Sequence, residues 1–307
     1  MKAIIFPGQG SQKAGMASEF QSNYKIVKDI FERADEVLKF SLSKIILNGS
    51  DEDLKKTEIT QPAILITSFA IFSVLKQEFK FDLSKIKYIA GHSLGEYSAL
   101  VASGSLSLED GVTLVHKRGK LMQAAVPEGK GAMLAVMGLN INELKLLMKK
   151  YDTKKGICEI ANDNSPGQII LSGSKETLVS FSNNLKVEKK RSIFLPVSAP
   201  FHCSLMKQAA EDMKLFLQKT DFKNPSIELI SNVTALPVEK DGDIKDLLYK
   251  QIFSQVRWRE TLEYMIKNDI NDIIEIGPGK VLSGLVKRTN DKVLSRSITK
   301  IDDIKSL

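Results

Sequence analysis

Cysteine is scarce in this sequence, and the only two residues, Cys158 and Cys203, stand far apart. No C-x-x-C pair and no metal-ligand spacing occurs, so we expect neither a disulfide framework nor a metal site. Histidine occurs three times, and aromatic residues make up only 7% of the chain. With no recognition-helix motif and no basic stripe interleaved with aromatics, the composition argues against a nucleic-acid partner.

Long apolar runs are missing too. We find no stretch that approaches the ~20 residues needed to span a bilayer, so no membrane partner is expected. The chain passes from Met1-Lys2 directly into a short apolar segment at 3–6 and then a Pro-Gly turn. This is neither a signal-peptide core with a cleavage site nor an Arg- and Ser-rich transit peptide. We therefore expect a cytoplasmic protein.

The remaining composition is that of an ordinary globular protein, with 307 residues of which 43% are hydrophobic and 26% charged. This length suits one large α/β domain with an insertion, or two domains. The formal net charge is +7. Scattered surface lysines that favour solubility would explain it, and so would attraction to an anionic substrate or an acidic protein partner.

The most informative segment is Gly91-His92-Ser93-Leu94-Gly95. It follows a short apolar run at 87–90 and precedes a small-residue helical stretch at 96–100, which is the strand–turn–helix context of a G-x-S-x-G nucleophile elbow. The glycines permit a tight turn, and free N–H groups at the helix start face any oxyanion formed on Ser93. The segment predicts acyl transfer through an acyl-serine; a plain glycine-rich turn is the alternative.

Periodicity predicts the order of elements along the chain. Amphipathic patterns indicate helices at 17–39, 61–78 and 108–125, the last with Ser107 as N-cap. Parallel-sheet signals return late in the chain, with a helix from about 202 to 219 and apolar strands at 227–230 and 272–276.

Between these parts the pattern changes to the β-α-β-β-α-β order typical of a ferredoxin-like fold. Its expected strands are 132–137, 157–161, 168–173 and 191–196, and its expected helices are 141–150 and 175–187. We therefore predict an α/β protein. Residues 1–129 and 198–307 form a parallel-sheet core, and residues 130–197 form an inserted ferredoxin-like subdomain.

A serine nucleophile needs a base, and histidine is the usual one. His92 is adjacent to Ser93 on the elbow, and His116 lies within a predicted helix. His202 follows Pro200-Phe201 in a loop where strand ends should gather, and is the best candidate. No acid stands out as a third triad member, so a Ser–His pair oriented by a backbone carbonyl fits better.

Arg118 falls on the apolar face of the helix at 108–125, four residues after Leu114 and four before Met122. A guanidinium facing the core needs an anionic partner, because an unpaired buried charge costs several kcal/mol. An internal salt bridge would supply one, and so would a substrate carboxylate held by two parallel hydrogen bonds. The sequence alone leaves both interpretations open.

Six segments together carry a family resemblance. They are GQGSQ at 8–12, GHSLGEYSAL at 91–100, KRGKLMQ around Arg118, NDNSPGQ at 162–168, PFHCSLM at 200–206 and GPGKVL at 277–282. Spread over essentially the whole chain, they resemble the malonyl-CoA:acyl carrier protein transacylases of bacterial fatty acid synthesis. The resemblance implies a ping-pong reaction in which malonyl-CoA acylates Ser93 and the thiol of an acidic acyl carrier protein then takes the malonyl group, with no bound cofactor. The expected form is a monomer.

The resemblance also implies that the parallel-sheet core is α/β-hydrolase-like, and it implies residue roles. His202 would act as base and then acid, with the backbone carbonyl of Gln251 orienting it, and the backbone N–H groups of Gln9 and Leu94 would form the oxyanion hole. The expected substrate-binding residues are Arg118, which would bind the malonyl carboxylate, together with Met122, Asn162, Asn164 and Phe201.

Three other functions remain open on the sequence. One is a serine hydrolase or thioesterase on the same core, which the elbow alone would support. Another is an acyltransferase of a polyketide pathway. The third is a non-catalytic scaffold that docks carrier protein through its basic surface, although the Ser, His and Arg set argues against it.

Overall fold

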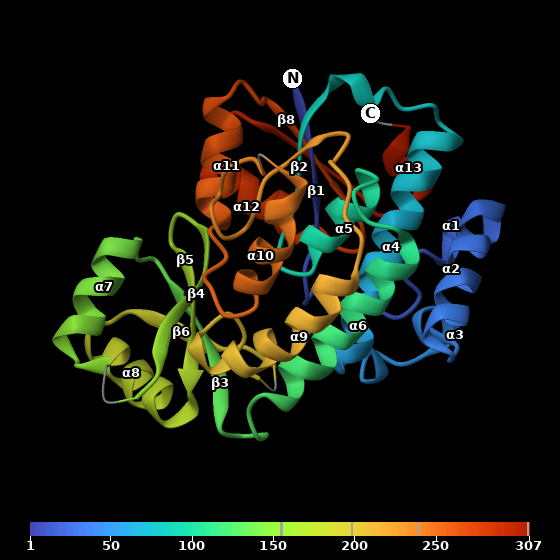
Figure 1. Cartoon of the computed structure of the whole chain (residues 1–307). Helices are drawn as coiled ribbons and strands as arrows, with labels where there is room; N and C mark the ends of the chain where they lie inside the picture. Colours follow the sequence, from blue (N-terminus) through green and yellow to red (C-terminus); the bar gives the residue numbers. More distant parts are fainter. Residues whose placement is uncertain (154–155, 198, 239, 306) are drawn as a thin grey trace.

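A computed structural model describes residues 1–153, 156–197, 199–238, 240–305 and 307. Its larger part is built on a five-stranded parallel sheet with the strand order β7-β2-β1-β8-β9, of which Figure 1 labels β2, β1 and β8. The strands are β1 (Lys2–Phe6), β2 (Ile86–Gly91), β7 (Glu228–Leu229), β8 (Asp272–Ile276) and β9 (Leu294–Ile298). β1 and β8 are buried along nearly their whole length because helices cover both faces of the sheet.

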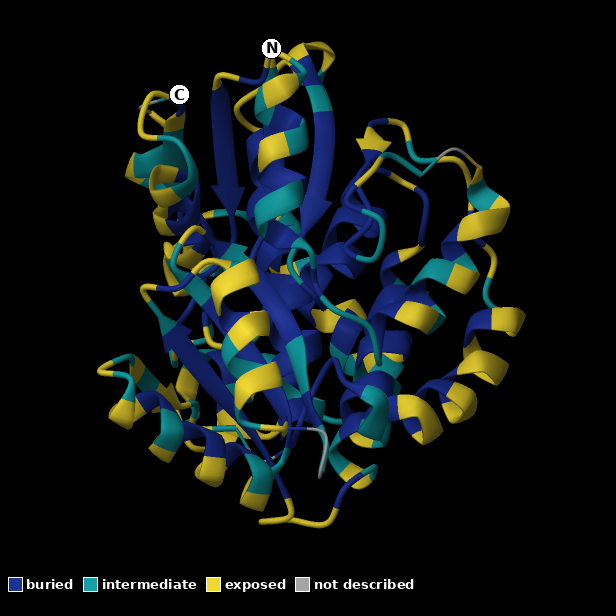
Figure 2. Ribbon diagram, turned by 90° about the vertical axis from the view of Figure 1, so that its left-hand side faces the viewer, coloured by how far each residue is buried: buried dark blue, intermediate teal, exposed yellow. Residues whose placement is uncertain are grey.

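Alternate side chains of β1 enter two different cores. Ile4 and Phe6 belong to the large core, whereas Ala3 and Ile5 face the opposite side. The helices of this part are α1 (Ser18–Asn23), α2 (Lys25–Leu38), α3 (Leu42–Asn48), α4 (Thr57–Gln77), α5 (Gly95–Ala102), α6 (Leu108–Ala124), α9 (Lys207–Lys219), α10 (Asp241–Gln251), α11 (Trp258–Lys267), α12 (Val281–Thr289) and α13 (Ile301–Ile304). Helices α2, α4, α5 and α6 cover the Ile4 side, and α11 and α12 cover the Ala3 side. In Figure 2 the inward surfaces are buried and the exposed residues follow the outer helix faces.

Helix α4 corrects one expectation from the sequence. It is long and apolar enough to cross a membrane by length and composition, although no such run was expected. It packs against α2, α5 and α6 at the centre of the large core, and 83% of its most apolar window is buried. The burial of α4 in the core therefore accounts for its apolar sequence.

The part of the chain between α6 and α9 contains a second sheet. Its strand order is β4-β5-β3-β6, and each neighbouring pair of strands is antiparallel. Its elements are β3 (Gly131–Met137), α7 (Ile141–Lys150), β4 (Cys158–Ser165), β5 (Gln168–Ser174), α8 (Lys175–Val187) and β6 (Arg191–Phe194). This is the predicted β-α-β-β-α-β order. The segment has its own apolar core, which includes Leu134, Leu171 and Phe181. The protein is thus a mixed α/β fold with a parallel sheet and a separate antiparallel sheet.

Local structure differs from the predictions at several points. The helix expected at 17–39 is two helices, because Tyr24 is extended (φ −126°, ψ 123°) and its N–H closes α1 on the carbonyl of Phe20. The helix expected from about 202 begins only at Lys207, since His202 has a positive φ and a 3₁₀ turn intervenes at Ser204–Met206. Strand β9 and helices α3, α10, α11, α12 and α13 were not predicted.

Strand β2 and helix α5 cross at unusually short range. A Cβ atom on Gly91 would lie 1.9 Å from the backbone carbon and oxygen of Gly95, and one on Gly95 would lie 2.3 Å from the carbonyl oxygen of Phe6. Both positions therefore need glycine so that the elbow can fold back on the sheet.

Gly91→Ala should therefore destabilise the protein by at least about 3 kcal/mol, because backbone atoms rather than flexible side chains must move. Gly284→Ala is the matched control: it lies in α12 with no atom within 4 Å of its Cβ position, and should raise stability by about 0.5–1 kcal/mol. Urea unfolding of both variants measures the difference. Equal stability of the two variants would contradict the close crossing.

Candidate active site

Ser93 occupies the tip of the turn between β2 and α5. Its φ of 54° lies in the left-handed region that a serine seldom adopts. Asn232, in the loop after β7, holds the turn: its Oδ1 accepts from the Ser93 N–H at 2.7 Å, and its Nδ2 donates to the Gly91 carbonyl at 2.7 Å. The surrounding structure thus fixes a strained residue, as is common at functional sites.

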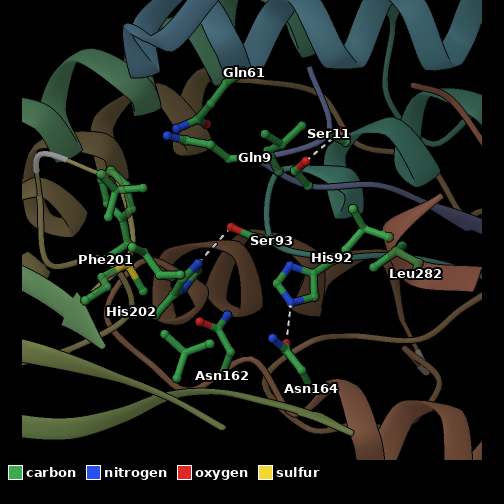
Figure 3. Close-up of a pocket in the computed structure, with 18 of the residues that line it drawn as sticks. Gln9, Ser11, Gln61, His92, Ser93, Asn162, Asn164, Phe201, His202 and Leu282 are labelled. Carbon is green, nitrogen blue, oxygen red and sulfur yellow. Dashed lines mark hydrogen bonds between the residues drawn. The ribbon is translucent and has the colours of Figure 1, made fainter. Parts of the chain in front are cut away.

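His202 meets this serine from the loop that follows the antiparallel sheet. The Ser93 Oγ lies 2.7 Å from His202 Nε2 (Figure 3), and His202 Nδ1 lies 2.8 Å from the backbone carbonyl of Gln251. Because a carbonyl can only accept, Nδ1 carries the proton, and Nε2 is left to accept from the serine hydroxyl. No carboxylate contacts the imidazole among the described residues, so the arrangement is a Ser–His pair.

The environment keeps the imidazole neutral. Burial, followed by the positive charge of Arg118, lowers the pKa of His202 to about 3, against the opposing hydrogen bond to Gln251. An uncharged imidazole with a free Nε2 lone pair is the form that acts as a general base.

Arg118 is buried in the same place. Its Nη2 donates to Ser93 Oγ at 3.0 Å and to Gln251 Oε1 at 2.9 Å, and its Nη1 donates to Gln61 Oε1 at 2.7 Å. Its Nε has no hydrogen-bond partner in the described part of the chain. No ion pair joins Arg118 to a described carboxylate, so the internal salt bridge considered from the sequence is absent there. A buried cation held only by neutral groups is suited to binding an anion from outside.

A cavity of about 240 Å³ opens over these groups. Every site residue expected from the sequence lines it except Gln251, which lies behind the imidazole. The predicted residues along its wall are Gln9, Ser93, Leu94, Arg118, Met122, Asn162, Asn164, Phe201 and His202. The structure thus brings together residues from the parallel-sheet part and from the antiparallel sheet (Figure 3).

Two backbone N–H groups beside the serine are free. Neither the N–H of Leu94, the N-cap residue of α5, nor that of Gln9 donates to any described residue. The Gln9 side chain is held away by a 3.3 Å hydrogen bond from Nε2 to Thr57 Oγ1. Both N–H groups are therefore available to a ligand in the cavity.

The other two histidines have different surroundings. His92 packs edge-on against Trp258, and its Nε2 lies 2.9 Å from Asn164 Oδ1, so it links the elbow to the antiparallel sheet. His116 is half-buried, and its Nδ1 bonds the carbonyl of Glu58. Cys203 is buried beside the site, where burial raises the pKa of its thiol to about 11.

Sequence reasoning missed three polar residues around the site, namely Gln61, Asn232 and Glu96. Glu96 is 1% exposed, and its Oε2 accepts from Gln251 Nε2 at 2.7 Å and from the Asn232 N–H at 3.3 Å. Burial raises the pKa of this carboxyl to about 7, although those hydrogen bonds and the charge of Arg118 oppose the shift. One signal could have identified it, since Glu96 is the only charged residue in a helix that is otherwise apolar or small.

Comparison with known proteins places the chain in a class. Residues 3–305 match the family model described as "Acyl transferase domain", which makes the protein an acyl transferase. The malonyl CoA-acyl carrier protein transacylase of Bacillus subtilis is 43% identical over 299 residues, 97% of this chain and 93% of the relative. The crystal structure of that transacylase from Clostridium perfringens is 40% identical with a TM-score of 0.94, and the match covers 99% of this chain and 95% of the other. The chain belongs to the malonyl CoA-acyl carrier protein transacylase family.

One similar structure holds two proteins. It is a type II PKS acyl-carrier protein in complex with its malonyl-transacylase, with 37% identity, a TM-score of 0.95, and coverage of 99% of this chain and 98% of the other.

Within the described residues of the present chain, no group of three or more His, Cys, Asp or Glu could hold a metal ion.

The free energy of unfolding of Glu96→Gln, compared with that of the unchanged protein, should increase as pH rises. The pKa of Glu96 is raised from 4.5 to about 7, so between these pH values the folded state holds a proton that the unfolded state has lost. Stability therefore falls by up to ~1.4 kcal/mol per pH unit in that window, and the variant lacks this loss.

Urea unfolding of both proteins at several pH values from 4.5 to 8 measures this. The difference should grow with pH to at most about 3 kcal/mol. Glu32→Gln, on the exposed face of α2, controls for loss of a carboxylate at the surface. A difference that does not change with pH would show that folding does not shift the pKa of Glu96.

Proposed function

We propose that the protein transfers the malonyl group of malonyl-CoA to the phosphopantetheine thiol of acyl carrier protein, supplying fatty acid synthesis. One observation carries the proposal. A neutral His202 and an Arg118 that pairs with no described carboxylate both contact the Ser93 hydroxyl inside one cavity. The family supports the same activity, because its curated members are named for it.

In the first half-reaction, Ser93 Oγ attacks the thioester carbonyl of malonyl-CoA and its proton passes to His202 Nε2. The free N–H groups of Leu94 and Gln9 stabilise the oxyanion. The carbonyl of Gln251 holds the Nδ1 proton and stabilises the imidazolium. When the tetrahedral intermediate collapses, the C–S bond breaks and the departing CoA thiolate takes the proton from His202.

The second half-reaction reverses these roles. The sulfur of the carrier-protein thiol attacks the malonyl-serine carbonyl, and His202 accepts the proton of this thiol. The C–O bond to Ser93 then breaks, and the serine oxygen recovers the proton from the imidazolium. The enzyme returns to its starting state after two transfers through one site, which is a ping-pong sequence.

Arg118 gives this reaction its selectivity. A malonyl group carries a carboxylate beside the reacting carbonyl, and the Arg118 guanidinium lies 3.0 Å from Ser93 Oγ. A bidentate contact would fix the acyl group with its carbonyl at the nucleophile. Met122, Phe201, Asn162 and Asn164 would line the remainder of the cavity and limit the access of water to the malonyl-serine.

We also propose the finer architecture predicted from the sequence. The larger part, residues 1–129 and 198–307, is an α/β-hydrolase-like core, and residues 130–197 form a ferredoxin-like insertion, which the strand order β6-β3-β5-β4 supports. Residue 198, at the boundary, lies outside the described residues. The proposed enzyme acts in the cytosol as a monomer, without a bound cofactor.

The carrier of a polyketide pathway is a second candidate acceptor. The complex of a type II PKS acyl-carrier protein with its malonyl-transacylase favours it, because that transacylase is 37% identical to this chain. Comparing transfer rates to purified carriers of the two pathways separates the candidates.

Intact-mass spectrometry tests the acyl-enzyme directly. Incubation with malonyl-CoA should add one malonyl group at Ser93, addition of carrier protein should remove it, and Ser93→Ala should acquire none. If free malonate forms quickly without carrier protein, the protein is a hydrolase and the transfer proposal fails.

Arg118→Ala should lower kcat/KM for malonyl transfer about 100-fold or more, because it removes a buried charge from the substrate's carboxylate. Acetyl transfer should hold or improve, since acetyl has no carboxylate to bind. Lys120→Ala, on the exposed side of the same helix, should change neither rate. Equal losses for both acyl groups would make Arg118 a structural residue.

A further inference from the structure

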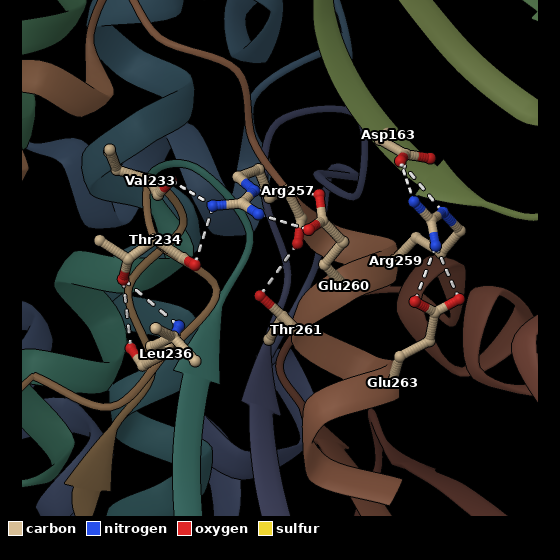
Figure 4. Close-up of polar contacts among 9 residues, drawn as sticks. All are labelled: Asp163, Val233, Thr234, Leu236, Arg257, Arg259, Glu260, Thr261 and Glu263. Carbon is tan, nitrogen blue, oxygen red and sulfur yellow. Dashed lines mark hydrogen bonds and ion pairs between the residues drawn. The ribbon is translucent and has the colours of Figure 1, made fainter. Parts of the chain in front are cut away.

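An ion pair joins the antiparallel sheet to the parallel-sheet part next to the cavity. Asp163 of β4 has a side chain that is 1% exposed, and its Oδ2 accepts from Arg259 Nε at 3.0 Å and Nη2 at 2.8 Å (Figure 4). Arg259, in the first turn of α11, also donates from Nη1 to both carboxylate oxygens of Glu263 at 2.7 Å. The guanidinium is thus fixed on its own helix and presents its other edge to Asp163.

The backbone makes the same connection. The Asp163 N–H donates to the Val256 carbonyl at 3.0 Å, and the Val256 N–H donates to the Ala161 carbonyl at 2.8 Å. This pairing forms a short parallel bridge between β4 and the segment that leads into α11. The ion pair and the bridge therefore hold one stretch of β4 against the start of α11, a helix that covers the parallel sheet.

The residues on either side of Asp163 line the cavity. The register of β4 shifts on both sides of Asp163, and the Asp163 side chain is turned to Arg259. Asn162 and Asn164 both border the cavity, and Asn164 is hydrogen-bonded to His92, the neighbour of the nucleophile. A shift of Asp163 would move both asparagines.

We propose that the Asp163–Arg259 pair is a positioning device for substrate binding: it sets where Asn162 and Asn164 stand over Ser93, and so determines how closely the cavity fits the acyl group. This inference rests on the proposed function for its substrate. The residues that perform the chemistry come from other elements, namely the elbow, the His202 loop, α6 and the end of α10. The pair should therefore affect binding more than the chemical step.

The charge of Asp163 depends on its partner. Burial raises the pKa of Asp163, and the hydrogen bonds and charge of Arg259 oppose that shift. Without the guanidinium, the carboxyl must either take up a proton or turn toward water, because a buried unpaired carboxylate is strongly disfavoured. Either change removes the fixed contact between β4 and α11.

Arg257 offers a matched control two residues away. It pairs with Glu260 on its own helix and donates to the carbonyls of Thr234 and Val233 at 3.0 and 3.4 Å (Figure 4). Among the described residues, its side-chain hydrogen bonds lie within the parallel-sheet part and none reaches β4. Loss of Arg257 removes the same type of side chain from the same region without releasing the antiparallel sheet.

The first experiment compares Arg259→Ala with Arg257→Ala in steady-state transfer. For Arg259→Ala we expect KM for malonyl-CoA to rise about fivefold or more while kcat stays within about twofold, because binding geometry is altered and the nucleophile is not. Malonyl-enzyme hydrolysis without carrier protein should also increase. Arg257→Ala should match the unchanged protein. Equal behaviour of the two variants, or a fall in kcat alone, would overturn the proposal.

The double variant Asp163→Asn, Arg259→Ala separates positioning from stability. It removes the orphaned carboxylate, so its urea midpoint should recover relative to Arg259→Ala. Its KM should stay high because no guanidinium remains at position 259 to hold β4 against α11. If KM returned to its original value together with stability, the pair would have only a structural role.

Hydrogen exchange provides a readout that does not depend on activity. Amides of β4 should exchange faster in Arg259→Ala than in Arg257→Ala, whereas amides of β1 and β8 should be unchanged. Unaltered exchange in β4 would also reject the proposal. If the unchanged protein failed to transfer malonyl groups but the exchange result held, the proposed function would fail while the contact between the two sheets stood.

Discussion

The geometry of the site depends on Gln251, the last residue of α10. Its backbone carbonyl accepts from His202, its Nε2 donates to the Ser93 carbonyl and to Glu96, and its Oε1 accepts from Arg118. The final carbonyls of a helix have no partner within the helix and carry its partial negative charge. The Gln251 carbonyl is therefore free for the imidazole and favours the imidazolium that forms when Ser93 loses its proton. A carboxylate is not needed for that purpose.

The two residues that meet over the cavity both have a strained backbone. Ser93 has a φ of 54° and His202 a φ of 59°, both in the left-handed region. Each is held by interactions from a distant segment, Asn232 for the serine and Gln251 for the histidine. Such conformations persist only where the surrounding structure determines them. The dense hydrogen bonding below the site is thus the condition for presenting both side chains to the cavity.

The sequence predicts those parts of the site that depend on local patterns. The elbow is contiguous, Arg118 shows through its helical period, and His202 stands out because only two other histidines compete with it. The side-chain amides of Gln251 and Asn232 have no local signature, because their partners lie more than a hundred residues away. Glu96 was overlooked because a glutamate in the first turn of a helix is ordinary, although it is the only charged residue of α5.

The same distinction explains the fold. Segments with a clear period and enough length, such as 108–125 and the β-α-β-β-α-β stretch, were predicted in order. Strand β9 has a polar alternation, Leu294-Ser295-Arg296-Ser297, and pairs only at the edge of the sheet, so no apolar run marks it. The break at Tyr24 follows from packing, since its ring contacts Phe20 and the distant Phe79. Tertiary contacts of this kind leave no trace in local periodicity.

The buried charges show why an amide stands between Arg118 and Glu96. A direct ion pair would stabilise the guanidinium but would occupy the edge that an incoming carboxylate needs. The Gln251 amide accepts from Arg118 and donates to Glu96, so it links the two charged groups through hydrogen bonds. Arg118 Nε keeps no hydrogen-bond partner among the described residues. With a pKa near 7, Glu96 can take up a proton when a second anion enters the site. The site is therefore suited to hold a cation in the absence of substrate without neutralising it.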